Sequence, residues 1–151
     1  MTTAKRPLTD LERAVLGAAL DRLVPPIDDL PGAGTMGLIP EVEATAGRHA
    51  PYCRALLLVL ERLVAARFDV LSGEAQDVAL SGIEKEHPAI FNALLDVVYL
   101  AYYSDPRVQR RIGWPGGALQ PRGFPLAPFD EAILETARRR KPLWRPVPGE
   151  A

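Results

Sequence analysis

Prolines divide this chain into segments that a helix cannot cross. The 151 residues include 15 prolines and 12 glycines. A proline inside a helix removes a backbone hydrogen bond and clashes with the preceding turn. Residues 8–24, 52–87, 89–105 and 129–141 contain no proline, so the longer helices must lie within these four segments.

Apolar residues recur every three or four positions within these segments, as they do on the buried face of a helix. Thr9 and Glu12 form a capping-box pattern at the start of the first helix, and Ser72 is placed to cap a later one. We expect helices over residues 10–24, 52–71, 73–86, 89–103 and 130–140, and a short helix beginning at Pro40. In the last helix, we expect Ala132, Ile133 and Ala137 to face inward.

No segment alternates apolar and polar residues over the length of a strand, so no strand is expected. The sequence therefore predicts an all-α, single-domain bundle of five to six helices over residues 1–151. Three segments lack helical periodicity. They are expected to form a flexible N-terminus (1–8), a long Pro/Gly-rich ordered loop (104–128) and an extended C-terminal tail (141–151).

Charge and hydropathy exclude several classes of function. The chain has 18 Lys and Arg against 19 Asp and Glu, so no basic excess indicates nucleic-acid binding. No run approaches the roughly 20 apolar residues of a membrane helix, so no membrane insertion is expected. The N-terminal charges precede no apolar stretch, so we expect no secretory signal and a cytoplasmic protein.

Gly32 to Gly37 matches the dinucleotide motif G-x-G-x-x-G, which requires a strand before it and a helix after it. The preceding residues, 25–31, include three prolines and two aspartates, so we interpret the motif as a loop between helices. His49 and Cys53 offer too few ligands for a closed zinc site, and the acidic residues 28, 29, 41 and 43 match no known cation-binding loop.

No serine lies in a G-x-S-x-G motif, and no acid–base pair is evident. We therefore expect no catalytic, cofactor-binding or metal-binding residues in this chain. A small enzyme that uses His49, Cys53 or the acidic loop remains an alternative.

The segment 89–103 carries a polar and aromatic stripe on an otherwise apolar helix, formed by Asn92, Asp96, Tyr99 and Tyr103. This stripe faces either solvent or a partner protein, since tyrosine suits an interface with one wet edge. Further large aromatic residues lie in or beside the non-periodic segments, namely Trp114, Phe124, Phe129 and Trp144. Two or more of them exposed together would mark a binding patch.

Two stretches carry a recognisable order of motifs. The first contains Leu8-Thr9, Glu12, Asp21-Arg22-Leu23-Val24-Pro25 and Pro31-Gly32-Ala33. The second contains Tyr102-Tyr103-Ser104-Asp105-Pro106, Gly113-Trp114 and Gly123-Phe124-Pro125. Together they resemble the small-subunit family of gluconate 2-dehydrogenase, often called subunit 3, over about 120 residues.

The resemblance implies a cofactor-free helical subunit that supports the folding, stability or export of a large FAD-dependent dehydrogenase of the glucose–methanol–choline type. In some relatives a cytochrome c subunit is also present. The FAD and the catalytic histidines would belong to the large subunit. On this view the partner interface comprises Tyr99, Tyr103, Asp105, Pro106, Trp114, Phe124 and Trp144. A free-standing helical adaptor that binds another protein through the same surface is the alternative.

The chain departs from the family at two places. Lys5-Arg6 lacks the apolar stretch of a twin-arginine export signal, which favours a cytoplasmic complex over a periplasmic one reached by co-export. Residues 108–112 replace the family's Tyr-Gly-Gly-Asn-like stretch, so this loop is expected to contact the partner differently.

Overall fold

The computed structural model describes residues 6–117, 122–123 and 128–141. The chain forms two compact units, Met1–Gly116 and Gly117–Ala151. The predicted all-α class is confirmed, since every regular element in these residues is helical. The β-type pairing within the same ranges is one isolated bridge between Ile27 and Leu30.

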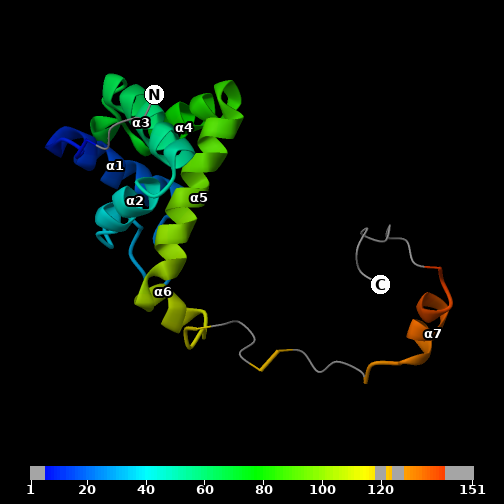
Figure 1. Cartoon of the computed structure of the whole chain (residues 1–151). Coiled ribbons are helices and arrows are strands. Elements are labelled where there is room, and N and C mark those ends of the chain that lie inside the picture. The colour runs from blue at the N-terminus through cyan, green and yellow to red at the C-terminus, as the bar shows by residue number, and fades with distance from the viewer. Residues whose placement is uncertain (1–5, 118–121, 124–127, 142–151) are drawn as a thin grey trace. The chain divides into compact units, whose positions relative to one another are not determined.

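Residues 6–116 of the first unit form six α-helices and one 3₁₀ turn (Figure 1). They are α1 (Asp10–Leu23), α2 (Ile39–Ala46), α3 (Ala50–Ala65), η1 (Phe68–Val70), α4 (Gly73–Glu86), α5 (Pro88–Ser104) and α6 (Pro106–Arg111). The prolines at positions 40, 51, 88 and 106 all lie at the first or second residue of a helix. Proline is tolerated there because its missing N–H would have no partner within the helix.

The predicted caps of α1 and α4 are confirmed. Thr9 Oγ1 accepts a hydrogen bond from the Glu12 N–H at 3.2 Å, and the Thr9 N–H donates to Glu12 Oε2 at 2.8 Å. Ser72 Oγ accepts from the Ala75 N–H at 3.4 Å. Leu8, just before α1, is buried in the core, and Arg6 forms an ion pair with Glu12. The last three residues of the predicted flexible segment 1–8 therefore include two that are anchored to the fold, Arg6 and Leu8.

Helix α5 is the central helix of this unit, as its nearly continuous apolar sequence predicts. It packs against α2, α3, α4 and α6, and in Figure 1 it runs from α4 to α6. Its buried side chains are Phe91, Leu94, Val97, Val98, Ala101 and Tyr102. Because α5 contacts four other helices, the surface at its C-terminal end is held in a defined position.

The G-x-G-x-x-G motif lies in the loop between α1 and α2 and packs tightly on α1. A Cβ atom on Gly34 would lie 2.0 Å from the carbonyl oxygen of Gly17. Asp21 accepts hydrogen bonds from the Thr35 N–H at 2.9 Å and from Thr35 Oγ1 at 2.8 Å. The glycines thus serve close packing between a helix and a loop, and Asp21 holds that loop in place.

Helix α3 ends earlier than predicted. The apolar spacing predicted a helix to residue 71, but α3 ends at Ala65 and Arg67 adopts a left-handed conformation with φ of 51°. The following 3₁₀ turn η1 places Phe68 fully inside the core. Burial of this aromatic side chain offsets the cost of a left-handed arginine, which apolar periodicity alone does not indicate.

The segment 104–128 was predicted to be a loop, but its first part is helix α6. Asp105 ends α5 and caps α6, since its side chain accepts from the Arg107 N–H at 2.8 Å. Pro106 begins α6, and Val108 anchors it in the core. Only one apolar side chain of this six-residue helix is buried, so its sequence shows no helical periodicity.

The second unit contains helix α7 (Ala132–Arg138). Ala132, Ile133 and Ala137, which were predicted to face inward, are exposed within this unit, as are its other described residues. Of the predicted tail, residues 141–151, all but Lys141 lie outside the described residues.

Replacing Gly34 with alanine tests the close packing of the loop on α1. The added Cβ would overlap the Gly17 carbonyl, so Gly34→Ala should lower the free energy of unfolding by about 1–3 kcal/mol in urea denaturation. Gly82→Ala is the control, because a Cβ there meets no atom within 4 Å. Since Gly82 lies inside α4, this control should raise stability by about 0.5–1 kcal/mol. Equal effects of the two variants would contradict the close approach.

The ion pair before α1 predicts a defined dependence of stability on pH. Hydrogen bonds from Arg6 and from the Thr9 N–H lower the pKa of Glu12 from 4.5 to about 2. A carboxyl with a lowered folded-state pKa contributes stability that is present above pH 4.5 and is lost as the pH falls through about 2.

The variant Glu12→Gln should therefore be less stable than the wild type at pH 7, with a difference that closes over this range. Urea unfolding at several pH values measures it. Glu84→Gln, at an exposed position on α4, controls for loss of one negative charge. A difference independent of pH would contradict the proposed pairing.

Candidate partner-binding surface

The C-terminal half of α5 exposes large apolar and aromatic side chains. The exposed fractions of Tyr99, Leu100 and Tyr103 are 43%, 51% and 49%, whereas Tyr102 is 8% exposed and packs inward. Tyr99 and Tyr103 lie one turn apart with ring centroids separated by 6.3 Å, and Tyr103 meets the edge of Tyr102 at 5.3 Å. Within the first unit, Tyr99 and Tyr103 of the predicted stripe thus lie on an exposed face of the central helix.

This face is hollowed into a groove of about 570 Å³, called the α5 groove below. Side chains from α3, α5 and the segment after α6 line it, namely Tyr52, Asp96, Tyr99, Leu100, Tyr103, Ser104 and Trp114. Ser104 Oγ donates to the Leu100 carbonyl at 2.6 Å, so its hydroxyl is already used within the helix. The groove is therefore mainly apolar and aromatic, with Asp96 as its charged side chain.

A second hollow of about 320 Å³ adjoins the groove and shares Tyr99 and Tyr103 with it. Its other wall is formed by residues 23–27, where α1 ends, and includes Ile27, which is 54% exposed. The sequence Asp21-Arg22-Leu23-Val24-Pro25 and the sequence Tyr102-Tyr103-Ser104-Asp105-Pro106 are thus brought side by side. These two motif stretches are about 80 positions apart along the chain.

Arginines of α6 fasten this region to the loop between α1 and α2. Arg107 forms an ion pair with Asp105 at 2.7 Å and donates to the Met36 carbonyl at 2.9 Å. The hydrogen bond from Arg107 lowers the pKa of the Asp105 carboxyl. Arg111 forms ion pairs with both Asp28 and Asp29. The position of α6, and of Trp114 after it, is thus set by contacts with the loop.

Trp114 has an unusual environment for an aromatic residue at a groove. Its backbone N–H donates to the Gln109 carbonyl at 2.9 Å, which fixes the chain where α6 ends. The residue is half-buried, and its indole Nε1 is buried without a hydrogen-bond partner among residues 6–117, 122–123 and 128–141. Buried donors are nearly always paired in folded proteins, so this group is an exception that requires an explanation.

Five of the seven predicted interface residues lie in one region of the first unit. Tyr99, Tyr103 and Trp114 line the groove, and Asp105 and Pro106 form the junction between α5 and α6 beside it. Phe124 and Trp144 lie outside the described residues. Sequence reasoning missed Tyr52, Leu100 and Ile27, because their place on this surface depends on how helices distant in the sequence pack together.

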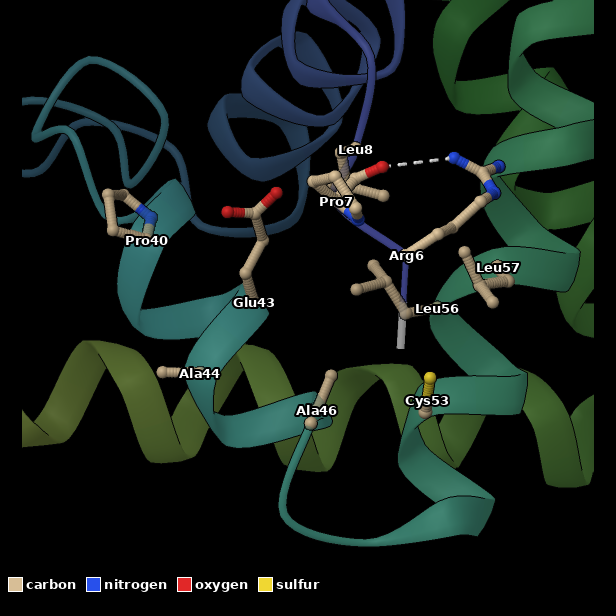
Figure 2. A pocket seen from close by; sticks show the side chains of 11 residues that line it. Arg6, Pro7, Leu8, Pro40, Glu43, Ala44, Ala46, Cys53, Leu56 and Leu57 are labelled. Atoms are coloured by element: carbon tan, nitrogen blue, oxygen red, sulfur yellow. Dashed lines mark hydrogen bonds between the residues drawn. The ribbon is translucent and has the colours of Figure 1, made fainter. Parts of the chain in front are cut away.

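The histidine and cysteine of the alternative enzyme hypothesis both lie at the start of α3. Cys53 lies in a separate pocket of about 400 Å³ between α2, α3 and the segment before α1 (Figure 2). The charged residues of that pocket, Arg6 and Glu43, form ion pairs with Glu12 and Arg13. His49 packs edge-on against Tyr52 at 5.6 Å.

Three of the four acidic residues at positions 28, 29, 41 and 43 form ion pairs with arginines. Asp28 and Asp29 are paired with Arg111, and Glu43 with Arg13. No group of three or more His, Cys, Asp or Glu residues that could hold a metal ion occurs within residues 6–117, 122–123 and 128–141.

None of the helices in the described part of the chain combines the length and apolar character needed to cross a membrane. Comparison of the chain with protein-family models, curated proteins and solved structures gives no match.

The ion pairs of Arg111 with Asp28 and Asp29 should hold α6 against the loop between α1 and α2. Arg111→Gln removes both ion pairs, so amide hydrogen exchange over residues 107–114 should become faster as α6 opens more often. Arg110→Gln is the matched control, since Arg110 is exposed and has no ion pair among the described residues. Equal exchange rates in the two variants would show that the ion pairs do not position α6.

Proposed function

We propose that this chain is a non-catalytic small subunit that binds and stabilises a large FAD-dependent dehydrogenase of the glucose–methanol–choline type. The substrate class is a sugar, a sugar acid or another alcohol. The FAD and the catalytic groups belong to the large subunit, and this chain binds no cofactor itself. The complex is cytoplasmic, with co-export to the periplasm as the alternative location and a cytochrome c subunit as a further component in some complexes.

The observation that carries the proposal is the meeting of the two motif stretches at one exposed surface. The end of α1 and the end of α5 form the two walls of the hollow that contains Tyr99 and Tyr103. The resemblance to the dehydrogenase small subunits rests on these same stretches. If the stretches served only the core, all their large side chains would be buried, but Tyr103 is exposed, as are Ile27 and Tyr99 beside the stretches.

The composition of this surface suits contact with a protein. Aromatic residues are enriched at the centre of interfaces, where they contribute large apolar area at a low entropic cost. Tyrosine, tryptophan and leucine side chains line the groove, so a partner that covers it removes apolar surface from water, which is favourable. A large subunit that covers this surface would be stabilised by mass action, because the small subunit binds its folded form.

A free-standing helical adaptor is the second candidate. The first unit has a core that includes side chains from all six of its α-helices, so it can fold without a partner. The same surface would then bind a different protein. A flavoprotein dehydrogenase encoded beside this chain favours the small subunit over the adaptor.

Co-expression tests the proposal directly. The chain is produced with the flavoprotein dehydrogenase encoded next to it, and the mixture is separated by size exclusion with absorbance recorded at the flavin bands. We expect this chain to co-elute with a yellow protein that is insoluble or inactive when produced alone. A colourless chain that elutes apart from a fully active flavoprotein would contradict the proposal.

Alanine substitutions in the α5 groove should weaken the complex. Tyr103→Ala and Trp114→Ala each remove an aromatic anchor, so each should weaken binding by about 2 kcal/mol or more. Val78→Ala is the control, since Val78 is 73% exposed on α4 and lies outside the groove. Calorimetric titration of the purified subunits measures the effect. Unchanged affinity of both groove variants for the flavoprotein subunit would show that the α5 groove does not bind it.

A further inference from the structure

We infer that the α5 groove receives an apolar segment of the partner that presents two polar groups. One is a hydrogen-bond acceptor for the Trp114 indole, and the other is a lysine or arginine opposite Asp96. The inference rests on the proposed function, because the partner that supplies this segment is the flavoprotein subunit.

The acceptor on the partner is inferred from the buried indole N–H of Trp114. Its Nε1 is buried and has no hydrogen-bond partner in the described part of the chain. On folding, the N–H therefore loses the hydrogen bond that it makes with water in the unfolded chain. Trp114 as a whole is partly exposed and lines the groove. The inference is that a rotation of the indole on binding brings this N–H to the groove, where a carbonyl or carboxylate of the partner accepts it.

The cationic group of the partner is inferred from the Asp96 carboxylate, which loses its contact with water when the groove is covered. Asp96 is exposed and has no ion pair or hydrogen bond among the described residues. It is also the charged side chain among the seven residues that line the groove. An apolar segment that covers the groove removes water from this carboxylate, which is unfavourable unless an opposite charge replaces the water.

The other groups of the groove need no polar partner. The Ser104 hydroxyl donates to the Leu100 carbonyl, and tyrosine side chains can keep their hydroxyls at the wet edge of an interface. Apolar contact with Tyr99, Leu100 and Tyr103 therefore accounts for the rest of the segment. The groove thus recognises an apolar segment that has one cationic residue and one acceptor.

Variants of Asp96 test the charge. Affinity for the purified flavoprotein subunit is measured at several NaCl concentrations for the wild type, Asp96→Asn, Asp96→Lys and the control Glu84→Gln. We expect Asp96→Asn to bind about tenfold more weakly with a smaller dependence on salt, and Asp96→Lys to bind more weakly still. Glu84→Gln should bind as the wild type does, because Glu84 lies on α4 outside the groove.

Variants of Trp114 test the acceptor. Trp114→Phe removes the N–H, and benzothienylalanine at position 114 removes it while keeping the shape of the indole. Both should bind about tenfold more weakly, although the urea midpoint of the free chain is not lowered, because no hydrogen bond is lost there. If stability falls in parallel with affinity, Trp114 has a purely structural role, and the inferred hydrogen bond to the partner is wrong.

The outcomes separate the inference from the proposed function. If the wild type binds the flavoprotein and Tyr103→Ala weakens binding, but the Asp96 and benzothienylalanine variants bind normally, the inference is wrong and the function stands. If the wild type does not bind the flavoprotein at all, the proposed function fails and the inference fails with it.

Discussion

The contact between helix α1 and the glycine-rich loop determines how the functional surface is built. Gly34 lies so close to Gly17 that no side chain fits, and Asp21 fixes Thr35 through two hydrogen bonds. This contact places the Met36 carbonyl where Arg107 reaches it. Arg111 completes the attachment through the aspartates of the loop. The position of α6, and with it the tryptophan of the groove, therefore depends on a loop nearly 80 residues earlier.

Local signals predicted most of the fold and part of the surface. The capping box at Thr9 and the prolines at helix starts are determined by neighbouring residues, so α1, α2, α4 and α5 were placed to within a few residues. The end of α3 was wrong, because burial of Phe68 in the core decides it. Helix α6 was missed, since a capping aspartate followed by proline gives a weaker signal than apolar periodicity.

The aromatic stripe of α5 was visible in the sequence, but the groove was not. Helical spacing places Tyr99 and Tyr103 on one face, whereas the presence of Tyr52 and Ile27 beside them requires the packing of α1, α3 and α5. The G-x-G-x-x-G sequence matches a known motif, but the structure gives it another role. Its glycines permit a helix and a loop to touch, and the side chain beside them is Asp21, whose carboxylate would repel a phosphate.

The central claim is that the α5 groove is the surface that a protein partner covers. Hydroxyl-radical footprinting read by mass spectrometry measures it most directly, because oxidation reports the solvent exposure of individual side chains. The account predicts that Tyr99 and Tyr103 are oxidised readily in the free chain and become protected when the flavoprotein subunit is added, whereas Val78 on α4 stays reactive. Unchanged oxidation of both tyrosines in a complex that protects another face would contradict it.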